Sequence, residues 1–97
     1  MSEKNLMANS PKGDAFQLSL ANLATSALGG DQEIQSAVVW TEADGVYIRP
    51  VAGTATTSHF KLPASGMISL PYENLNEISV HNASGDTAIV YVIWRGR

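Results

Sequence analysis

The run of residues 87–95, with the sequence TAIVYVIWR, constrains the fold more than any other part of the chain. Isoleucine, valine, tyrosine and tryptophan favour extended backbone, because β-branched and aromatic side chains pack well on a pleated sheet. Successive side chains of a strand point to opposite faces, and both faces of this run are apolar. We therefore expect a central strand that is covered on each face, in a fold built on β-sheet.

Further segments carry strand signals between turns rich in Gly, Pro, Asn and Asp. They are residues 34–42, 45–50, 53–62, 67–70 and 78–81. Because Asp44-Gly45 can supply positive φ in a tight turn, we predict that the first two pair as a hairpin. The Thr-rich segment is predicted to be an edge or partner-facing strand. About seven or eight strands separated by turns indicate an all-β fold, a small antiparallel β-sandwich or jelly roll.

The first third of the chain permits two interpretations. Apolar residues alternate with polar or small ones in 16–20, as in a half-buried strand. A helix over 17–28 is the alternative, since Ala, Leu and Gln propagate helices well. Residues 1–15 are polar and have no apolar face, so we expect an extended N-terminal arm that becomes ordered only on a neighbouring subunit or a capsid. A frayed terminus is the alternative. The predicted division is thus an arm over 1–15 and a β-sandwich domain over 16–97.

Composition predicts association with other protein. A chain of 97 residues supports one domain, and a monomer of this size keeps roughly a third of its unfolded surface exposed. No cysteine is present to form a disulfide or a thiolate metal site, and 15% of the residues are charged, against about 25% in typical domains. A small core and a weakly charged surface together predict a homo-oligomer.

The same composition argues against several other partners. Lys and Arg number six and are scattered along the chain, so they form no basic stripe that could neutralise phosphates. We expect no nucleic-acid partner and no membrane partner. No segment approaches the ~18 consecutive apolar residues of a membrane span, and the first residues lack the apolar region of a signal peptide. The expectation is a protein made and kept in a cytosol unless it leaves inside a larger particle.

Catalytic patterns are weak. No serine lies in a nucleophile elbow, so Ser-His-Asp chemistry is not indicated. The nearest carboxylate pairs lie in turns, without the apolar pocket that an acid catalyst needs. These pairs are Glu73 with Glu77 and Glu42 with Asp44. His59 and His81 are predicted to be single polar residues on solvated or interface faces, with a shared metal or acid–base role as the alternative. We expect no enzymatic activity, no catalytic residues, no metal and no cofactor.

Aromatic side chains offer a second functional interpretation, because flat apolar rings stack on sugar rings. The candidates are Trp40, Tyr47, Tyr72, Tyr91 and Trp94. Trp40 and Trp94 lie in the strongest strands, so we first expect them in the core or in a subunit interface. A structural subunit should bury one of these tryptophans, whereas a sugar-binding module should expose a coplanar pair of rings.

The order of features after Val38 resembles a known group of proteins. An apolar strand is followed by DGVYIRPVAG at 44–53, LPASGMISLP at 62–71 and NLNEISVHNASGDTAIVYVIWRGR at 74–97. This order resembles the small β-sandwich proteins of tailed-phage virions. The resemblance implies a non-enzymatic head decoration (cement) protein or another accessory capsid protein. Its place would be the virion capsid surface, with the host cytoplasm as its location during assembly.

That resemblance also implies partners. The major capsid protein or other virion proteins would bind the chain, and a trimer is favoured because capsid lattices offer threefold and quasi-threefold axes. Expected interface residues lie in the arm, the Thr-rich segment and the C-terminal end. They are Leu6, Met7, Thr54, Thr56, Arg95 and Arg97. The alternative function is a carbohydrate- or receptor-binding β-sandwich module.

Overall fold

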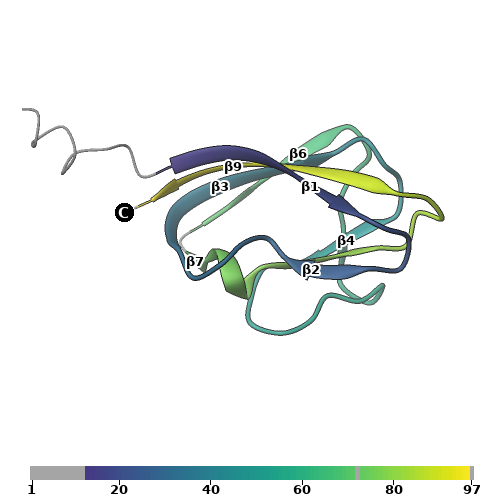
Figure 1. The fold of residues 1–97 in the computed structure, drawn as a ribbon, viewed down its shortest axis with the longest axis horizontal. Helices are drawn as coiled ribbons and strands as arrows, with labels where there is room; N and C mark the ends of the chain where they lie inside the picture. Colours follow the sequence, from purple (N-terminus) through teal and green to yellow (C-terminus); the bar gives the residue numbers. More distant parts are fainter. Residues whose placement is uncertain (1–12, 72, 97) are drawn as a thin grey trace, which may run out of the picture.

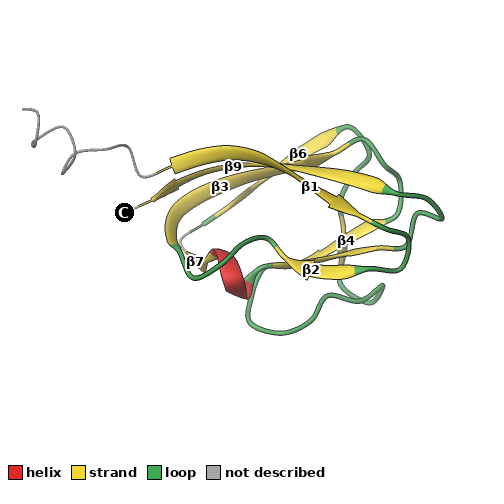
Figure 2. Ribbon diagram, viewed as in Figure 1, coloured by secondary structure: helices red, strands yellow, loops and turns green. Residues whose placement is uncertain are grey.

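The structure is a computed structural model that describes residues 13–71 and 73–96. In this part, nine strands form two antiparallel sheets stacked as two layers (Figures 1 and 2), which confirms the predicted all-β sandwich. The strands are β1 (Gly13–Leu20), β2 (Thr25–Ala27), β3 (Glu33–Thr41), β4 (Val46–Arg49), β5 (Phe60–Lys61), β6 (Gly66–Leu70), β7 (Glu73–Asn74), β8 (Ser79–Asn82) and β9 (Ala88–Gly96), with a one-turn 3-10 helix η1 (Leu75–Glu77) after β7.

The five-stranded sheet has the order β1-β9-β3-β6, and β7 also pairs with β3. The four-stranded sheet has the order β2-β8-β4-β5. The central position of β9, between β1 and β3, confirms the prediction from residues 87–95. The expectation that β9 is covered on each face is wrong, because Val90 and Val92 are buried while Ile93 is 57% exposed. Two layers have room for only one buried face each, and no described element covers the other side of β9.

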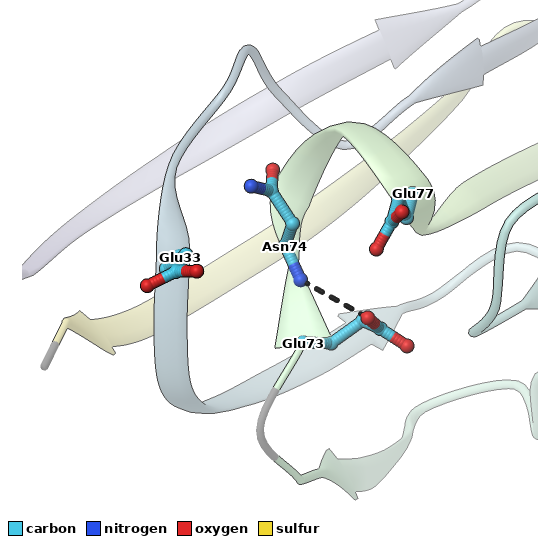
Figure 3. Close-up of a pocket in the computed structure, with 4 residues that line it drawn as sticks. All are labelled: Glu33, Glu73, Asn74 and Glu77. Carbon is cyan, nitrogen blue, oxygen red and sulfur yellow. Dashed lines mark hydrogen bonds between the residues drawn. The ribbon is translucent and has the colours of Figure 1, made fainter.

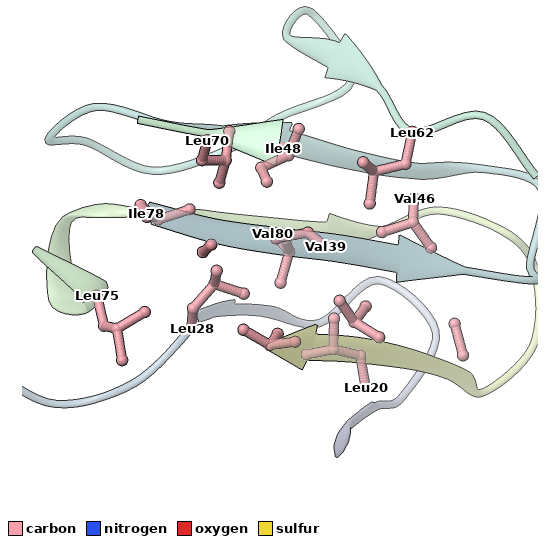
Figure 4. Packing of buried hydrophobic residues seen from close by; sticks show 14 of the residues in the cluster. Leu20, Leu28, Val39, Val46, Ile48, Leu62, Leu70, Leu75, Ile78 and Val80 are labelled. Carbon is pink, nitrogen blue, oxygen red and sulfur yellow. The ribbon is translucent and has the colours of Figure 1, made fainter. Parts of the chain in front are cut away.

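The core lies between the two sheets. Figure 4 shows side chains of β3, β4, β8 and β9 meeting there, with Val39, Ile48 and Val80 fully buried. Each belongs to the inward-pointing set of its strand, as the period of two requires. Leu75 of η1 and Leu28, which follows β2, complete one end of this cluster. Trp94, at the end of β9, packs partly buried against the cluster, as expected for a core residue.

The predicted hairpin between residues 34–42 and 45–50 is wrong. Both strands exist, but β3 pairs with β6, β7 and β9, whereas β4 pairs with β5 and β8 in the other sheet. Both sides of β3 are therefore occupied, and the chain crosses between layers after Thr41. Gly45 has a φ of 116°, as the Asp-Gly signal predicted. A Cβ at Gly45 would lie 2.9 Å from the Ser84 Cα, so glycine also permits the close approach of two loops.

The helical alternative for residues 17–28 is also wrong, since β1 and β2 occupy this segment. The chain leaves the five-stranded sheet after Leu20 and enters the four-stranded sheet at Thr25. Between them, Leu23 has a φ of 69° and a backbone N–H that donates to the Asn82 carbonyl. Contacts with the distant residue Asn82 thus override the local helix propensity.

The Thr-rich strand predicted over 53–62 shrinks to Phe60–Lys61, which forms the edge of the four-stranded sheet. Thr54 and Thr56 instead lie in the exposed loop that precedes it. Side chains hold this loop in place of a strand ladder: the Ala55 N–H donates to the Ser79 Oγ at 2.7 Å, and that hydroxyl donates to the Gly53 carbonyl at 3.2 Å.

Most of the predicted arm, residues 1–12, lies outside the described residues. Residues 13–15, which we had assigned to the arm, are part of β1 and pair with β9 from Gly13 opposite Arg95 onward. The described sandwich therefore begins earlier than residue 16.

Candidate functional site

The outer face of the five-stranded sheet is the candidate functional surface. Side chains that alternate with the buried ones point to this side of β1, β9, β3 and β6. Two neighbouring rows cross all four strands, the first being Gln17, Tyr91, Trp40 and Met67 and the second Ala15, Ile93, Val38 and Ser69. Met67 is 71% exposed and Ile93 57% exposed. No charged side chain lies in either row, so the described centre of this face is apolar or neutral.

Trp40 and Tyr91 form the middle of the first row. They lie directly opposite each other on β3 and β9, and their ring centroids are 4.6 Å apart with a tilt of 33° between the planes. Beside them a shallow groove of about 290 Å³ is lined by residues of β1, β3 and β9. Its lining is Ala15, Phe16, Gln17, Trp40, Tyr91, Val92 and Ile93. Both rings are half-buried, so each presents an edge or part of a face to this groove.

Among the described residues of this face, charged side chains lie at its two ends. Arg95 is two residues beyond Ile93 on β9 and is exposed. Glu42 follows β3 at the opposite end, where it lines a second hollow with Ile89 and Tyr91. Within the described part of the chain neither Arg95 nor Glu42 forms an ion pair. The face therefore has a positive end and a negative end, about 20 Å apart by strand geometry.

A separate acidic pocket lies beside β7 and η1 (Figure 3). Glu33, Glu73 and Glu77 line it together with Asn74, around a volume of about 260 Å³. The Asn74 side chain accepts from the backbone N–H groups of Gln32 and Asn76. This amide thus caps η1 and ties the loop before β3 to it, which gives the pocket a structural explanation.

The pair Glu73 and Glu77, singled out by sequence spacing, does come together in this pocket. A hydrogen bond to Glu73, which only protonated Glu77 can donate, raises the pKa of Glu77 above its usual value of 4.5. Loss of hydration and repulsion from Glu73 and Asp31 act in the same direction. Glu77 itself is exposed to solvent, unlike the acid of a glycosidase in an apolar pocket.

The two histidines make separate local contacts. His59 lies before β5, where its Nε2 is 3.2 Å from the Arg49 Nη1 and its Nδ1 accepts from the Thr56 N–H at 2.9 Å. His81, on β8, contacts the Thr25 hydroxyl at 2.6 Å. Among the described residues, no three His, Cys, Asp or Glu side chains gather in a way that could hold a metal ion. In the same part of the chain no helix has the length and apolar character to cross a membrane.

The structure does not bring the predicted interface residues together. Thr54 and Thr56 are exposed in the loop before β5, next to the four-stranded sheet, whereas Arg95 lies on the five-stranded sheet. Leu6, Met7 and Arg97 lie outside the described residues, as does the aromatic candidate Tyr72. Tyr47 of β4 lies on the other sheet.

Sequence reasoning missed the outer face, although a signal was present. In the run 87–95 the residues that point to both faces of the strand are apolar, and residues 38–40 show the same pattern. We had expected both faces of this strand to be covered. In a two-layer sandwich that second face has to be exposed or covered by another molecule.

Comparisons with known proteins support the fold alone. The cupin domain of Cnp3 from Schizosaccharomyces pombe is similar, with a TM-score of 0.63 and 13% identity over 92% of this chain and 56% of that one. A protein of unknown function with a cupin-like fold from Ralstonia eutropha gives a TM-score of 0.58 and 14% identity over 90% and 53%. The chain thus spans a little over half of these structures. No protein-family model and no curated protein match the sequence.

Proposed function

We propose that this chain is a non-enzymatic structural subunit that works by packing the outer face of its five-stranded sheet against other protein. The observation that carries the proposal is the apolar, unpaired face built around Tyr91, Trp40 and Ile93. Large contiguous apolar patches on small monomers mark interaction sites, because exposure of such area to water is unfavourable. Depletion of charge at the centre, with charge kept to the rim, is the usual composition of protein interfaces.

The setting we propose for this subunit is the capsid surface of a tailed phage, as a decoration or cement protein. The sequence resemblance over the second half of the chain supports this assignment. Many identical sites on a capsid lattice would also strengthen weak contacts, because each engaged copy raises the effective concentration of the next contact. The same lattice supports a homo-oligomer. The trimer expected from its threefold axes is one candidate state, and the outer face itself favours a pair of copies instead, for the reasons given in the next subsection.

The test is binding to heads that lack accessory protein and come from the same genome as this chain. We expect wild-type protein to co-sediment with them and Ile93→Lys to lose at least about tenfold in retention, since a charge would enter an apolar contact. Phe60→Lys is the matched control: Phe60 is 56% exposed on β5 of the other sheet. Equal retention of both variants, or no retention of wild type, contradicts the proposal.

The second candidate function is carbohydrate binding, and the Trp40–Tyr91 pair is the observation that favours it. Two neighbouring rings beside a groove provide apolar area of the kind on which a sugar ring can stack. The 33° tilt makes the pair less flat than the platform expected for this function. Titration of oligosaccharides against tryptophan fluorescence tests it: saturable quenching in wild type that is lost in Trp40→Ala supports sugar binding, and unchanged fluorescence excludes it.

A further inference from the structure

The outer face is large enough to be half of a stable dimer. Four strands spaced about 4.8 Å apart, with a rise of about 3.3 Å per residue, give roughly 500 Å² of flat area on this side of the sheet. Two such faces in contact bury on the order of 1,000 Å², before the relief of the side chains adds to it. That area reaches the range in which specific protein interfaces begin.

The charges at the ends of the face define which arrangement of two copies is favourable. Consider a twofold axis that lies in the plane of the interface and is perpendicular to the strands. The strands of the second copy then run in the opposite direction to those of the first. Arg95 of one copy then lies over the end that carries Glu42 in the second copy, and symmetry forms this contact twice. An axis parallel to the strands would place Arg95 near Arg95 and Glu42 near Glu42, which is repulsive.

The same axis matches the two rows by size. Thr41 pairs with Val90, so the next residue, Glu42, lies at the level of Ile89 on β9. The point midway along β9 between this level and Arg95 is Val92. The axis therefore passes between the rows of Tyr91 and Ile93, so that each row lies over the other row of the second copy. Large side chains then face small or β-branched ones: Tyr91 over Ile93, Trp40 over Val38, Met67 over Ser69 and Gln17 over Ala15. This is the interdigitation that close sheet packing requires.

We propose that a second copy of this chain occupies the outer face, in a face-to-face dimer whose twofold axis crosses the strands. This inference rests on the proposed function, because it names the occupant of the same surface. Such an interface is isologous, so the same patch serves both copies and the pair is closed. Association through this face converts a two-layer sandwich into a stack of four sheets, in which β9 is covered on each side.

The first measurement is sedimentation equilibrium of the full chain up to about 100 µM, where a dimer of micromolar affinity is almost fully formed. We expect wild type and Phe60→Lys to be dimers and Ile93→Lys to be a folded monomer, with dimerisation weakened at least about 100-fold. A monomeric wild type, a trimer, or a dimer unaffected by Ile93→Lys overturns the inference. Circular dichroism verifies that each variant is folded.

A charge-reversal cycle tests the direction of the axis. Arg95→Glu and Glu42→Arg should each weaken the dimer about 3- to 10-fold, because each creates two like-charge contacts. The double variant should return to within about threefold of wild type, and all these differences should shrink at high salt. Additive weakening in the double variant overturns the proposed arrangement.

Binding to phage heads separates this inference from the proposed function. A monomeric wild type whose retention on heads depends on Ile93 would mean that the face binds a different protein, so the dimer fails and the structural role stands. A dimer that passes the charge-reversal cycle but is not retained on heads would mean that the inference holds and the capsid assignment fails.

Discussion

Asn82 is a buried polar side chain that joins several segments of the described core. It is fully buried at the end of β8, with a relative exposure of 0%. Its Nδ2 donates to the carbonyls of Leu20 at 3.0 Å, Ala21 at 3.2 Å and Asp86 at 2.7 Å, and its Oδ1 accepts from the Ser84 N–H at 2.9 Å. One amide therefore joins the end of β1 to the loop before β9.

Replacing Asn82 with alanine removes these bonds. The carbonyls of Ala21 and Asp86 each keep one other donor, the Ala24 N–H and the Ser84 hydroxyl, both at 3.0 Å. A net hydrogen bond contributes about 1 kcal/mol, and an unsatisfied buried group costs about 1–3 kcal/mol. The two Nδ2 hydrogens serve three carbonyls, so one hydrogen is shared, and Oδ1 accepts one further bond. We therefore expect the free energy of unfolding to fall by about 3–5 kcal/mol. Stability of a domain of this size is about 5–15 kcal/mol, so the melting temperature should fall by roughly 15–25 °C.

Thermal melts and urea titrations of Asn82→Ala test this expectation, with Asn22→Ala as the matched control. Asn22 is exposed and accepts one bond, from the Gly85 N–H in the same loop, so its loss should cost under about 1 kcal/mol. Asn82→Asp should be worse than alanine at pH 7, because a carboxylate would face carbonyl oxygens, and should improve when acid restores a donor. A melting temperature for Asn82→Ala within about 4 °C of wild type would refute the reasoning.

Three further outcomes are expected. Val92→Asp should not fold, as judged by circular dichroism, because Val92 is 1% exposed in the core and a buried carboxylate costs several kcal/mol. In urea titrations Gly45→Ala should destabilise more than Gly85→Ala: both have positive φ, but a Cβ would meet backbone only at Gly45. The pKa of Glu77 is raised in the folded state. Its contribution to stability is therefore full below pH 4.5 and declines as the pH rises through the folded-state pKa. In thermal melts between pH 4 and 7, Glu73→Gln should reduce this pH dependence of stability.

Strand positions could be predicted from the sequence because they follow from local chemistry. Residues 34–42 and 87–95 are rich in β-branched and aromatic side chains, and β3 and β9 occupy them almost end to end. Proline closes 67–70 at Pro71, and β6 ends at Leu70. A fold class of two antiparallel layers follows from the number and spacing of such segments.

Strand pairing could not be predicted in the same way, because it depends on contacts between distant residues. Gly45 has the positive φ that the Asp44-Gly45 signal predicted, yet the neighbours of β3 come from residues 66–74 and 88–96. The loop before β5 has strand-like composition, but the Ser79 hydroxyl, 24 residues from Ala55, satisfies its backbone. Asn82 contacts Leu20 and Ala21, 62 and 61 residues away, so no local pattern reveals its role.

The candidate site was hidden for a related reason: alternation in a sequence identifies two faces of a strand but not what covers each. β9 lies in the middle of its sheet and buries one face in the core. Its second apolar face is not covered by any described part of the chain. Tyr91 and Ile93 do not belong to the core cluster, to which β9 contributes Ala88, Val90 and Val92, with Trp94 packed against it. An apolar pair outside the core is explained by a surface that packs against protein, and the opposite charges of Arg95 and Glu42 at its ends give that surface a direction.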